Sequence, residues 1–157
     1  MARKARSSAG VLLYRNHGAA HQVLLAHPGG PFWARREEGA WTIIKGEIEP
    51  GEAPEAAARR EFAEETGAEL TATLVPLGWV RQAAGKIVHG FAAEQDFNPE
   101  ALKSNQVGIN WPPRSGRIAY FPEIDRVEWF KIDRARDRMN VAQRAFLDRL
   151  ETQPFAT

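Results

Sequence analysis

The stretch ARREFAEETG carries three glutamates and two arginines around one phenylalanine. If this stretch is helical, Glu61, Glu64 and Glu65 lie at positions i, i+3 and i+4 and share one face. A solvated face with salt bridges would place a Lys or Arg three or four residues from each glutamate. Only Glu64 has such a neighbour, Arg60. The uncompensated acid indicates a hard divalent cation held by carboxylate oxygens, with the solvated face as the alternative.

This acidic face is the second half of a longer motif. From Gly46 to Ala68 the sequence resembles the signature of the Nudix hydrolases. The fixed identities of that signature are all present, at Gly46, Glu52, Arg60, Glu61, Glu64, Glu65 and Gly67. Phe62 fills the first apolar position, and the small Ala68 fills the last. A chance match to so many spaced identities is expected at below about 10⁻⁶ per chain.

The resemblance implies both a fold and a reaction. The implied fold is α/β, the Nudix-type α/β/α sandwich in which a mixed β-sheet is flanked by helices. The implied reaction is the cleavage, with Mg²⁺ or its substitute Mn²⁺, of the pyrophosphate linkage of a nucleoside diphosphate joined to another group. Cations neutralise the phosphate oxygens so that an oriented water can attack phosphorus. The alternatives are an ADP-ribose or other nucleotide-sugar pyrophosphatase and a nucleotide-binding module without turnover.

Motif position implies a role for each residue. Glu64 and Glu65 are implied metal ligands, and Glu61 is implied as a ligand or as the general base. The carbonyl of Gly46 is a further candidate ligand. Arg60 is placed to orient Glu64, so the expected catalytic set is Glu61, Glu64 and Arg60.

Other candidates lie beside or outside the motif helix. Glu52 either holds a further metal through water or braces its loop. Lys45 is placed to meet a phosphate, with a solvated lysine at a strand end as the equal alternative. A further metal-binding acid is expected from one of four residues near strand ends: Glu94, Asp96, Glu123 and Glu128.

The substrate is less closely specified. The stretches SAGVLLYR and KGEIEPGE are similar to members that act on nucleoside triphosphates or dinucleoside polyphosphates, which are therefore the expected substrates. In WPPRSGR, Arg114 and Arg117 are candidates for a phosphate-binding loop, with a solvated loop as the alternative. Candidates for stacking on a base, each with a place in the core or rim as the alternative, are Phe32, Trp33, Trp79, Trp111 and Tyr120.

The elements that position these residues follow from apolar patterns and turn signals. Strands are expected over residues 8–14, 22–27, 40–46, 71–82, 86–95 and 126–132. The motif helix is expected over residues 54–66, with Gly67 as its C-cap and with Phe62 and Ala63 packed on the sheet. A second helix is expected over residues 140–151, with Val141 on its apolar face. Residues 28–39 and the polar segment 96–116 are expected to be loops.

Length and composition set the wider expectations. With 157 residues the chain is expected to form a single domain over residues 1–157, with residues 1–7 as a flexible basic tail. The net charge of +1 provides no global field for nucleic acid or a membrane, so a small nucleotide is the expected partner. The lack of cysteine and of a long apolar run favours a cytoplasmic protein, expected as a monomer or a homodimer.

Overall fold

The computed structural model describes residues 7–17 and 20–152. The strands are β1 (Ser7–His17), β2 (Ala20–Pro28), β3 (Ile44–Glu47), β4 (Val75–Arg81), β5 (Ile87–Glu94), β6 (Gln106–Asn110), β7 (Ile118–Pro122) and β8 (Ile124–Lys131). The helices are α1 (Pro54–Thr66), α2 (Ile132–Arg138) and α3 (Arg144–Glu151). Short 3₁₀ turns are η1 (Ala83–Gly85), η2 (Pro99–Ala101) and η3 (Val141–Gln143).

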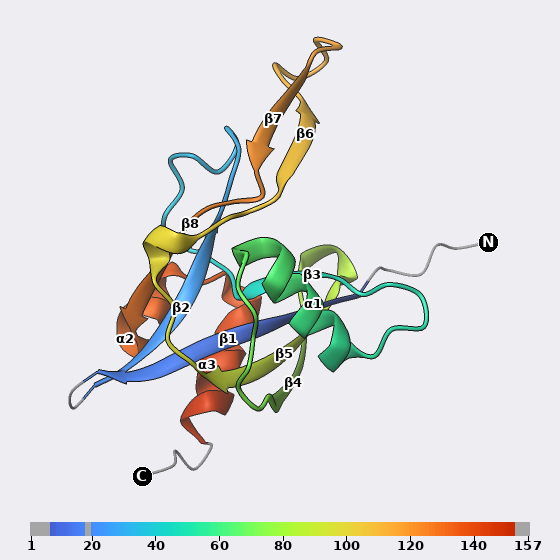
Figure 1. Cartoon of the computed structure of the whole chain (residues 1–157). Helices are drawn as coiled ribbons and strands as arrows, with labels where there is room; N and C mark the ends of the chain where they lie inside the picture. The colour runs from blue at the N-terminus through green and yellow to red at the C-terminus, as the bar shows by residue number, and fades with distance from the viewer. Residues whose placement is uncertain (1–6, 18–19, 153–157) are drawn as a thin grey trace.

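The central sheet has the strand order β4-β5-β1-β2-β8, and β3 pairs with β1. β1 runs parallel to β5, whereas the other pairs within this sheet are antiparallel. The expected mixed sheet is therefore confirmed. β6 and β7 pair with each other and form an arm that projects from the rest of the chain in Figure 1.

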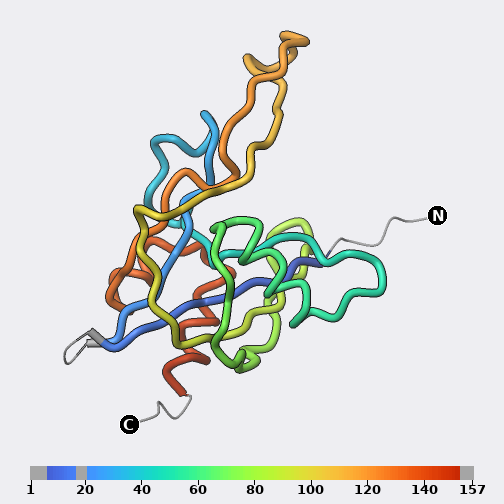
Figure 2. The backbone as a smooth tube through the Cα atoms, in the orientation of Figure 1, coloured from blue at the N-terminus to red at the C-terminus, as the bar shows by residue number. Residues whose placement is uncertain are grey.

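Side chains alternate across the central sheet and build two cores. Val11 and Leu13 of β1 pack in the core that includes α1, whereas Leu12 packs in the core that includes α2 and α3. Helices therefore cover both faces of the sheet, with α1 on the near side and α3 on the far side in Figures 1 and 2. The α/β/α sandwich implied by the motif is confirmed.

α1 approaches the sheet closely because small residues form its contact face. Ala57 and Ala58 are fully buried, and Phe62 extends into the core. Ala63, which we expected to pack on the sheet, is exposed, because a helix turns about 100° between neighbouring residues. Gly67 ends the helix in the left-handed region with φ of 78°, and its N–H donates to the Ala63 carbonyl, as predicted.

The expectation of a loop over residues 96–116 is wrong. The segment contains η2 and β6, and β6 forms an antiparallel ladder with β7. Most residues of β6 are exposed on both sides of the arm. A strand without one buried face has no apolar alternation, so the sequence carried no signal for it.

Three further differences concern the start of the last helix, an additional helix and the start of the first strand. Residues 140–151 begin as η3, which leaves Val141 70% exposed instead of on the apolar face of a helix. Helix α2 has no counterpart among the expected elements. Ser7, assigned to a flexible tail, pairs with Ile87 as the first residue of β1, and residues 1–6 lie outside the described part of the chain.

Among the described helices, none is long and apolar enough to cross a membrane.

The contact between β5 and α3 provides a test of this packing. A Cβ atom at Gly90 would lie 2.6 Å from the ring of Phe146, which is fully buried. We expect Gly90→Ala to lower the free energy of unfolding by about 1–3 kcal/mol, because the ring has no room to retreat. In urea denaturation, adding Phe146→Leu should recover part of that loss. Strictly additive losses in the double variant would contradict the contact.

Candidate active site

A pocket of about 660 Å³ opens where α1, β3 and several connecting segments meet. This volume is typical of small-molecule sites. Its wall has an acidic part formed by α1 and Glu123, and a basic part formed by Lys45 and Lys86. A third, uncharged part includes Gln82 and Asn140. The pocket thus presents three different kinds of surface to one ligand.

The acidic part is more deeply buried than a solvated helix face would be. Glu61 is 8% exposed and Glu65 is 3% exposed. Burial, followed by the hydrogen bond and charge of Glu123, raises the pKa of Glu65 to about 9. Burial also raises the pKa of Glu61 above its ordinary value. Among the described residues, Glu65 Oε2 has no hydrogen-bond partner. The site therefore holds carboxyl groups that the surrounding side chains do not fully neutralise.

Gly46 leaves the space that the Glu61 carboxylate occupies. A Cβ atom at position 46 would lie 1.9 Å from Glu61 Oε2 and 2.0 Å from its carboxyl carbon. Gly46 belongs to β3, which pairs with β1 directly beneath α1. The glycine of the motif is therefore required by the close approach of the strand and the helix at this point.

Arg60 holds the acidic part of the site together. Its Nη1 donates to Glu61 Oε1 at 2.8 Å and to Glu64 Oε2 at 3.1 Å. Its Nε and Nη2 donate to the two carboxylate oxygens of Glu52, at 2.8 and 2.9 Å. Nη2 also donates to the carbonyl of Glu47 at 2.9 Å. The predicted contact of Arg60 with Glu64 is present. The expectation that Glu61 has no arginine partner is wrong, because the long side chain of Arg60 also reaches the carboxylate of Glu61, its direct neighbour in the sequence.

Glu52 braces the loop that leads into α1. The hydrogen bonds from Arg60, and then one from the backbone N–H of Glu49, lower the pKa of Glu52 to about 2. A carboxylate held by this many donors has little capacity left for a cation. Of the two roles considered for Glu52, the structure favours bracing.

The basic part of the pocket contains one predicted residue and one that was missed. Lys45, predicted from its place before the motif, lines the pocket. Burial, and then the charge of Lys86, lowers the pKa of Lys45 to about 8. Lys86 lies before β5 and far along the chain from the motif, so no local pattern indicated it.

The structure separates the remaining candidates. Glu123 lines the pocket and contacts Glu65, whereas Glu94, Asp96 and Glu128 are not part of the pocket wall. Asp96 instead pairs with Arg15 at 2.7 Å. Of the four acids considered, Glu123 is therefore the one that joins the motif.

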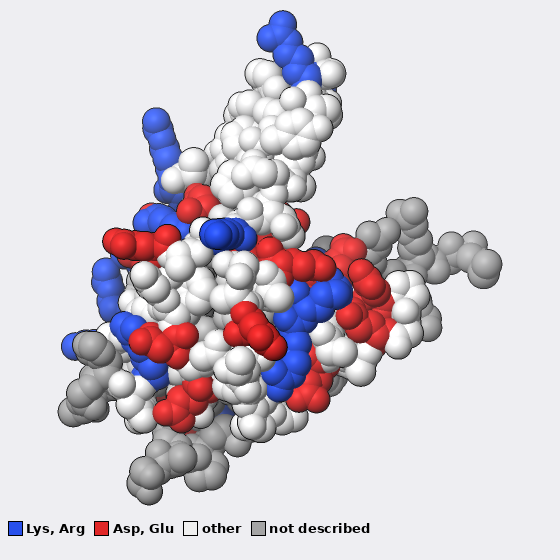
Figure 3. Space-filling model, in the orientation of Figure 1, with Lys and Arg blue, Asp and Glu red and all other residues white. Residues whose placement is uncertain are grey.

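Arg114 and Arg117 lie in the turn that connects β6 to β7, outside the pocket wall. Trp111 and Tyr120 lie in the same arm, and Trp79 is half exposed on β4. Trp33 is the one of the five aromatic candidates that lines the pocket. Figure 3 shows acidic and basic side chains side by side over α1, while the arm is largely uncharged up to its basic end.

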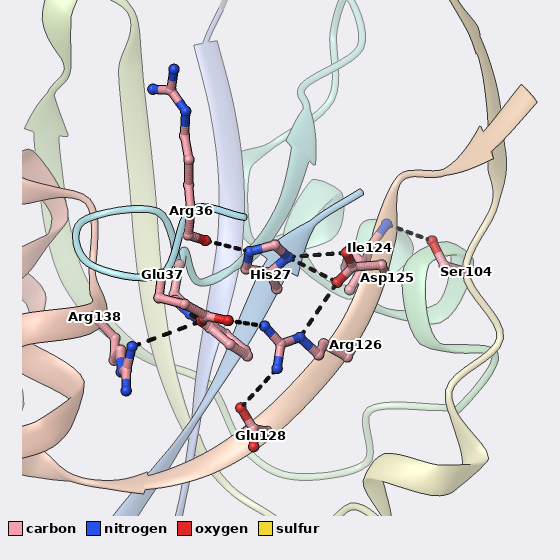
Figure 4. Close-up of polar contacts among 10 residues, drawn as sticks. His27, Arg36, Glu37, Ser104, Ile124, Asp125, Arg126, Glu128 and Arg138 are labelled. Carbon is pink, nitrogen blue, oxygen red and sulfur yellow. Dashed lines mark hydrogen bonds and ion pairs between the residues drawn. The ribbon is translucent and has the colours of Figure 1, made fainter. Parts of the chain in front are cut away.

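A buried histidine ties the segment that carries Trp33 to the sheet (Figure 4). His27 of β2 is 1% exposed, and its Nδ1 lies 2.9 Å from Asp125 Oδ1. Its Nε2 lies 2.6 Å from the carbonyl oxygen of Arg36. Through these two contacts His27 joins β2 to Asp125 in β8 and to the backbone of the segment that carries Trp33.

Charged side chains extend this connection. Glu37, next to Arg36, accepts a hydrogen bond from the indole nitrogen of Trp41 at 2.9 Å and forms an ion pair with Arg126. Arg138 lies 3.8 Å from the same carboxylate. Figure 4 shows these contacts converging on Glu37. The rim of the pocket is therefore fixed to β2, β8 and α2.

The acidic residues fit a hard divalent cation in their chemistry. The donors are carboxylate oxygens and the Gly46 carbonyl, which such cations prefer. The buried Oε2 atom of Glu65 lacks a partner, and a cation would supply one. Among the described residues, no group of three or more His, Cys, Asp or Glu side chains could hold a metal ion in the arrangement that the structure shows. Arg60 Nη1 contacts both Glu61 and Glu64, so a bound cation would have to share these two carboxylates with the guanidinium.

Comparison with known proteins identifies the family. The family model of the NUDIX domain matches residues 4–150. The chain belongs to the Nudix family. The resemblance of the motif is thereby confirmed.

Solved structures share this fold at low sequence identity. The Ap4A hydrolase of C. elegans in a binary complex has 19% identity and a TM-score of 0.65, covering 92% of this chain and 95% of that chain. A mutT/nudix family protein from Listeria innocua has 20% identity and a TM-score of 0.63, covering 96% and 94%. The NUDIX domain of Shewanella oneidensis NrtR, complexed with ADP ribose, has 16% identity and a TM-score of 0.63, covering 95% and 88%. At these identities the similarity establishes the fold alone.

One protein with related sequence is much longer than this chain. An octanoyltransferase from Myxococcus xanthus is 30% identical over 131 residues, which are 82% of this chain and 32% of that protein. The chain thus spans about a third of the relative's length. The transfer activity in that name is a property of the longer protein.

The clearance at Gly46 gives one prediction for the Nudix site. We expect Gly46→Ala to displace the Glu61 carboxylate and to reduce hydrolysis roughly 10- to 100-fold, by analogy with the loss of groups that orient metal ligands. The melting temperature should change little, because the end of a side chain moves more easily than backbone. Full turnover in this variant, measured with the best substrate of a nucleotide panel, would contradict the importance of the clearance.

The contacts of Arg60 give a second prediction. A lysine cannot reproduce the forked contacts with Glu52, Glu61 and Glu64 at once. We therefore expect Arg60→Lys to lower kcat/KM roughly 10- to 100-fold. Arg59→Lys is the matched control on the same helix, since Arg59 binds the carbonyls of Leu70 and Ala72 outside the pocket. Equal losses in the two variants would indicate a general effect on α1 instead of an effect on the site.

Proposed function

We propose that this Nudix chain is a Mg²⁺-dependent hydrolase of nucleoside triphosphates or dinucleoside polyphosphates. The observation that carries the proposal is that one pocket contains both the buried acids Glu61 and Glu65 and the lysines Lys45 and Lys86. A cluster of acids alone would repel a polyphosphate. Acids that hold a cation, with lysines beside them, provide complementary sites for the cation and for the phosphate oxygens.

The motif residues would divide the chemical work among them. Glu61, Glu64, Glu65 and the Gly46 carbonyl are the groups that would hold Mg²⁺. When bound, the cation neutralises phosphate oxygens and lowers the pKa of water. Motif position implied Glu61 as a ligand or as the general base. Because Glu64 is the most exposed of the three carboxylates, with 46% of its side chain accessible, we propose Glu64 instead as the group that orients a water and accepts its proton. Lys45 and Lys86 would bind phosphate oxygens and keep the phosphate in place while the water attacks phosphorus.

The arm begins beside the pocket, since Asn105 and Glu123, which flank β6 and β7, line the pocket wall. Five residues in each strand give β6 and β7 a length of about 17 Å. Arg114 and Arg117 at its end therefore remain proposed contacts only for a substrate that reaches beyond the pocket. A dinucleoside polyphosphate, with a second nucleoside attached to its phosphate chain, is such a substrate.

Cleavage of ADP-ribose or another nucleotide sugar is the second candidate. It is favoured by the similarity of this fold to a NUDIX domain that was solved with ADP ribose. Nucleotide binding without turnover is the remaining alternative. The complete set of motif acids favours turnover, because binding alone would not require a cluster of metal-binding carboxylates.

The decisive experiment is a nucleotide panel with identification of both products, with and without Mg²⁺. We expect turnover that requires the divalent cation, with triphosphates or dinucleoside polyphosphates as the best substrates. Metal-independent turnover, or no turnover of any member with Mg²⁺ or Mn²⁺, would refute the proposal. ADP-ribose as the best substrate would favour the second candidate.

Carboxylate variants test the assignment of the site. We expect Glu64→Gln and Glu65→Gln to reduce turnover roughly 100-fold or more, since each removes a charge that the reaction requires. Glu55→Gln is the matched control, because Glu55 is exposed on the first turn of the same helix. Full activity in either Glu64→Gln or Glu65→Gln would remove that residue from the site.

A further inference from the structure

The uncharged part of the pocket has no role in the chemistry proposed above. It contains the side-chain amides of Gln82 and Asn140, which come from segments that are distant in the sequence. Both are partly buried. Gln143, which is 0% exposed, donates from its side chain to the Gln82 amide and from its backbone N–H to the Asn140 backbone carbonyl. One buried residue thus fixes the Gln82 amide and the backbone of Asn140, whose own amide is held by the Ala142 N–H.

The orientation of Gln82 follows from a backbone donor. The N–H of Ile43 donates to Gln143 Oε1 at 2.9 Å, and a backbone nitrogen can only donate. The other end of the Gln143 amide is therefore its NH₂ group. That group lies 2.8 Å from Gln82 Oε1, which must accept. Gln82 thus turns its oxygen toward the core and leaves its own NH₂ group for the pocket.

Asn140 is oriented in the same way. Its Oδ1 accepts a hydrogen bond from the backbone N–H of Ala142 at 3.0 Å, as the N-cap of η3. Its backbone N–H donates to the Trp41 carbonyl at 2.8 Å, and its carbonyl accepts from the Gln143 N–H at 2.9 Å. The backbone and the oxygen of Asn140 are therefore engaged inside the protein. Among the residues that the structure describes, its NH₂ group has no acceptor, so this group remains for a ligand.

Two fixed donors select among the nucleobases. Guanine presents two neighbouring acceptors, O6 and N7, on one edge. On the same edge adenine presents the N7 acceptor beside the N6 amino group, which is a donor. An amide with a free oxygen and a free NH₂ group would suit adenine, but here each amide oxygen is already held by an internal donor. Donors that face N6 of adenine would leave it unpaired, and unpaired buried polar groups weaken binding.

We propose that the uncharged part of the pocket is a base subsite selective for 6-oxopurine nucleotides, read through the NH₂ groups of Gln82 and Asn140. This proposal deepens the proposed function and rests on it for the nature of the ligand. Trp33 lies on the same pocket wall and supplies an aromatic surface for the base. Gln143 is a positioning residue, since it fixes the Gln82 amide and the Asn140 backbone and is itself fully buried.

The test measures binding of GDP, IDP and ADP by calorimetry without a divalent cation, so that it does not depend on turnover. IDP has the 6-oxo group of guanine without its 2-amino group, so it isolates the O6 and N7 contacts. We expect GDP and IDP to bind roughly 10-fold or more tightly than ADP. 7-Deaza-GDP, which lacks the N7 acceptor, should lose much of the advantage. Equal affinities, or tighter binding of ADP, would overturn the proposal.

Two variants assign the preference to the amides. Asn140→Asp keeps the cap on the Ala142 N–H but replaces the NH₂ donor with an acceptor, so the ratio of IDP to ADP affinity should fall roughly 10-fold. Gln82→Met removes the other donor at similar length and should also lower this ratio. Asn110→Asp is the matched control, because Asn110 Oδ1 likewise caps a backbone N–H, at Gly116, but lies outside the pocket. An unchanged ratio in Asn140→Asp, or the same change in Asn110→Asp, would overturn the assignment.

These measurements separate the two proposals. Selective binding of IDP without hydrolysis of any nucleotide would support the base subsite and refute the proposed hydrolysis. Hydrolysis that depends on Mg²⁺, with no preference between IDP and ADP in binding, would support the proposed hydrolysis and refute the base subsite. Thermal denaturation of each variant shows whether a changed ratio occurs in a folded protein.

Discussion

The close approach of α1 to β3 is the constraint on which the site depends. Ala57 and Ala58 allow the helix to lie against the sheet, and Gly46 provides the space for the Glu61 carboxylate where the helix and strand meet. A larger residue at any of these positions would move the acids away from the strand. The small residues of the motif are therefore as necessary as its acids, because they set the depth at which the acids are buried.

That depth determines the electrostatics of the pocket. Glu65 is surrounded by other carboxyl groups and by little water, and its pKa is raised to about 9. Arg60 offsets this crowding for Glu61 and Glu64 but does not contact Glu65. The site therefore favours either a proton or a cation at Glu65. Because a cation displaces that proton, affinity for the metal is expected to be coupled to pH.

The sequence could group the motif acids because they lie on one helix with fixed spacing, and the structure places Glu61, Glu64 and Glu65 in one pocket wall. It could not single out Glu123 among four acids, since only the fold shows which strand end meets α1. Lys86, Gln82 and Asn140 carried no signal, because each becomes a pocket residue only when η1, β5 and η3 come together. The β6–β7 arm was missed for a different reason: its strands have no buried face, so they lack the apolar alternation on which strand prediction depends.

The segment that leads into and forms β3 connects the uncharged part of the pocket with its acidic part. Ile43 packs in the core with α2 and α3, and its N–H fixes the amide of Gln143. Ile44 packs in the core with α1, and Gly46 two residues later makes room for Glu61. Residues 43 to 46 thus contact the residue that orients the Gln82 amide on one side and the Glu61 carboxylate on the other. Because this short segment lies between two packed cores, it sets the distance between the uncharged and acidic parts of the pocket, so a nucleotide that bound both proposed subsites would be held in a defined position.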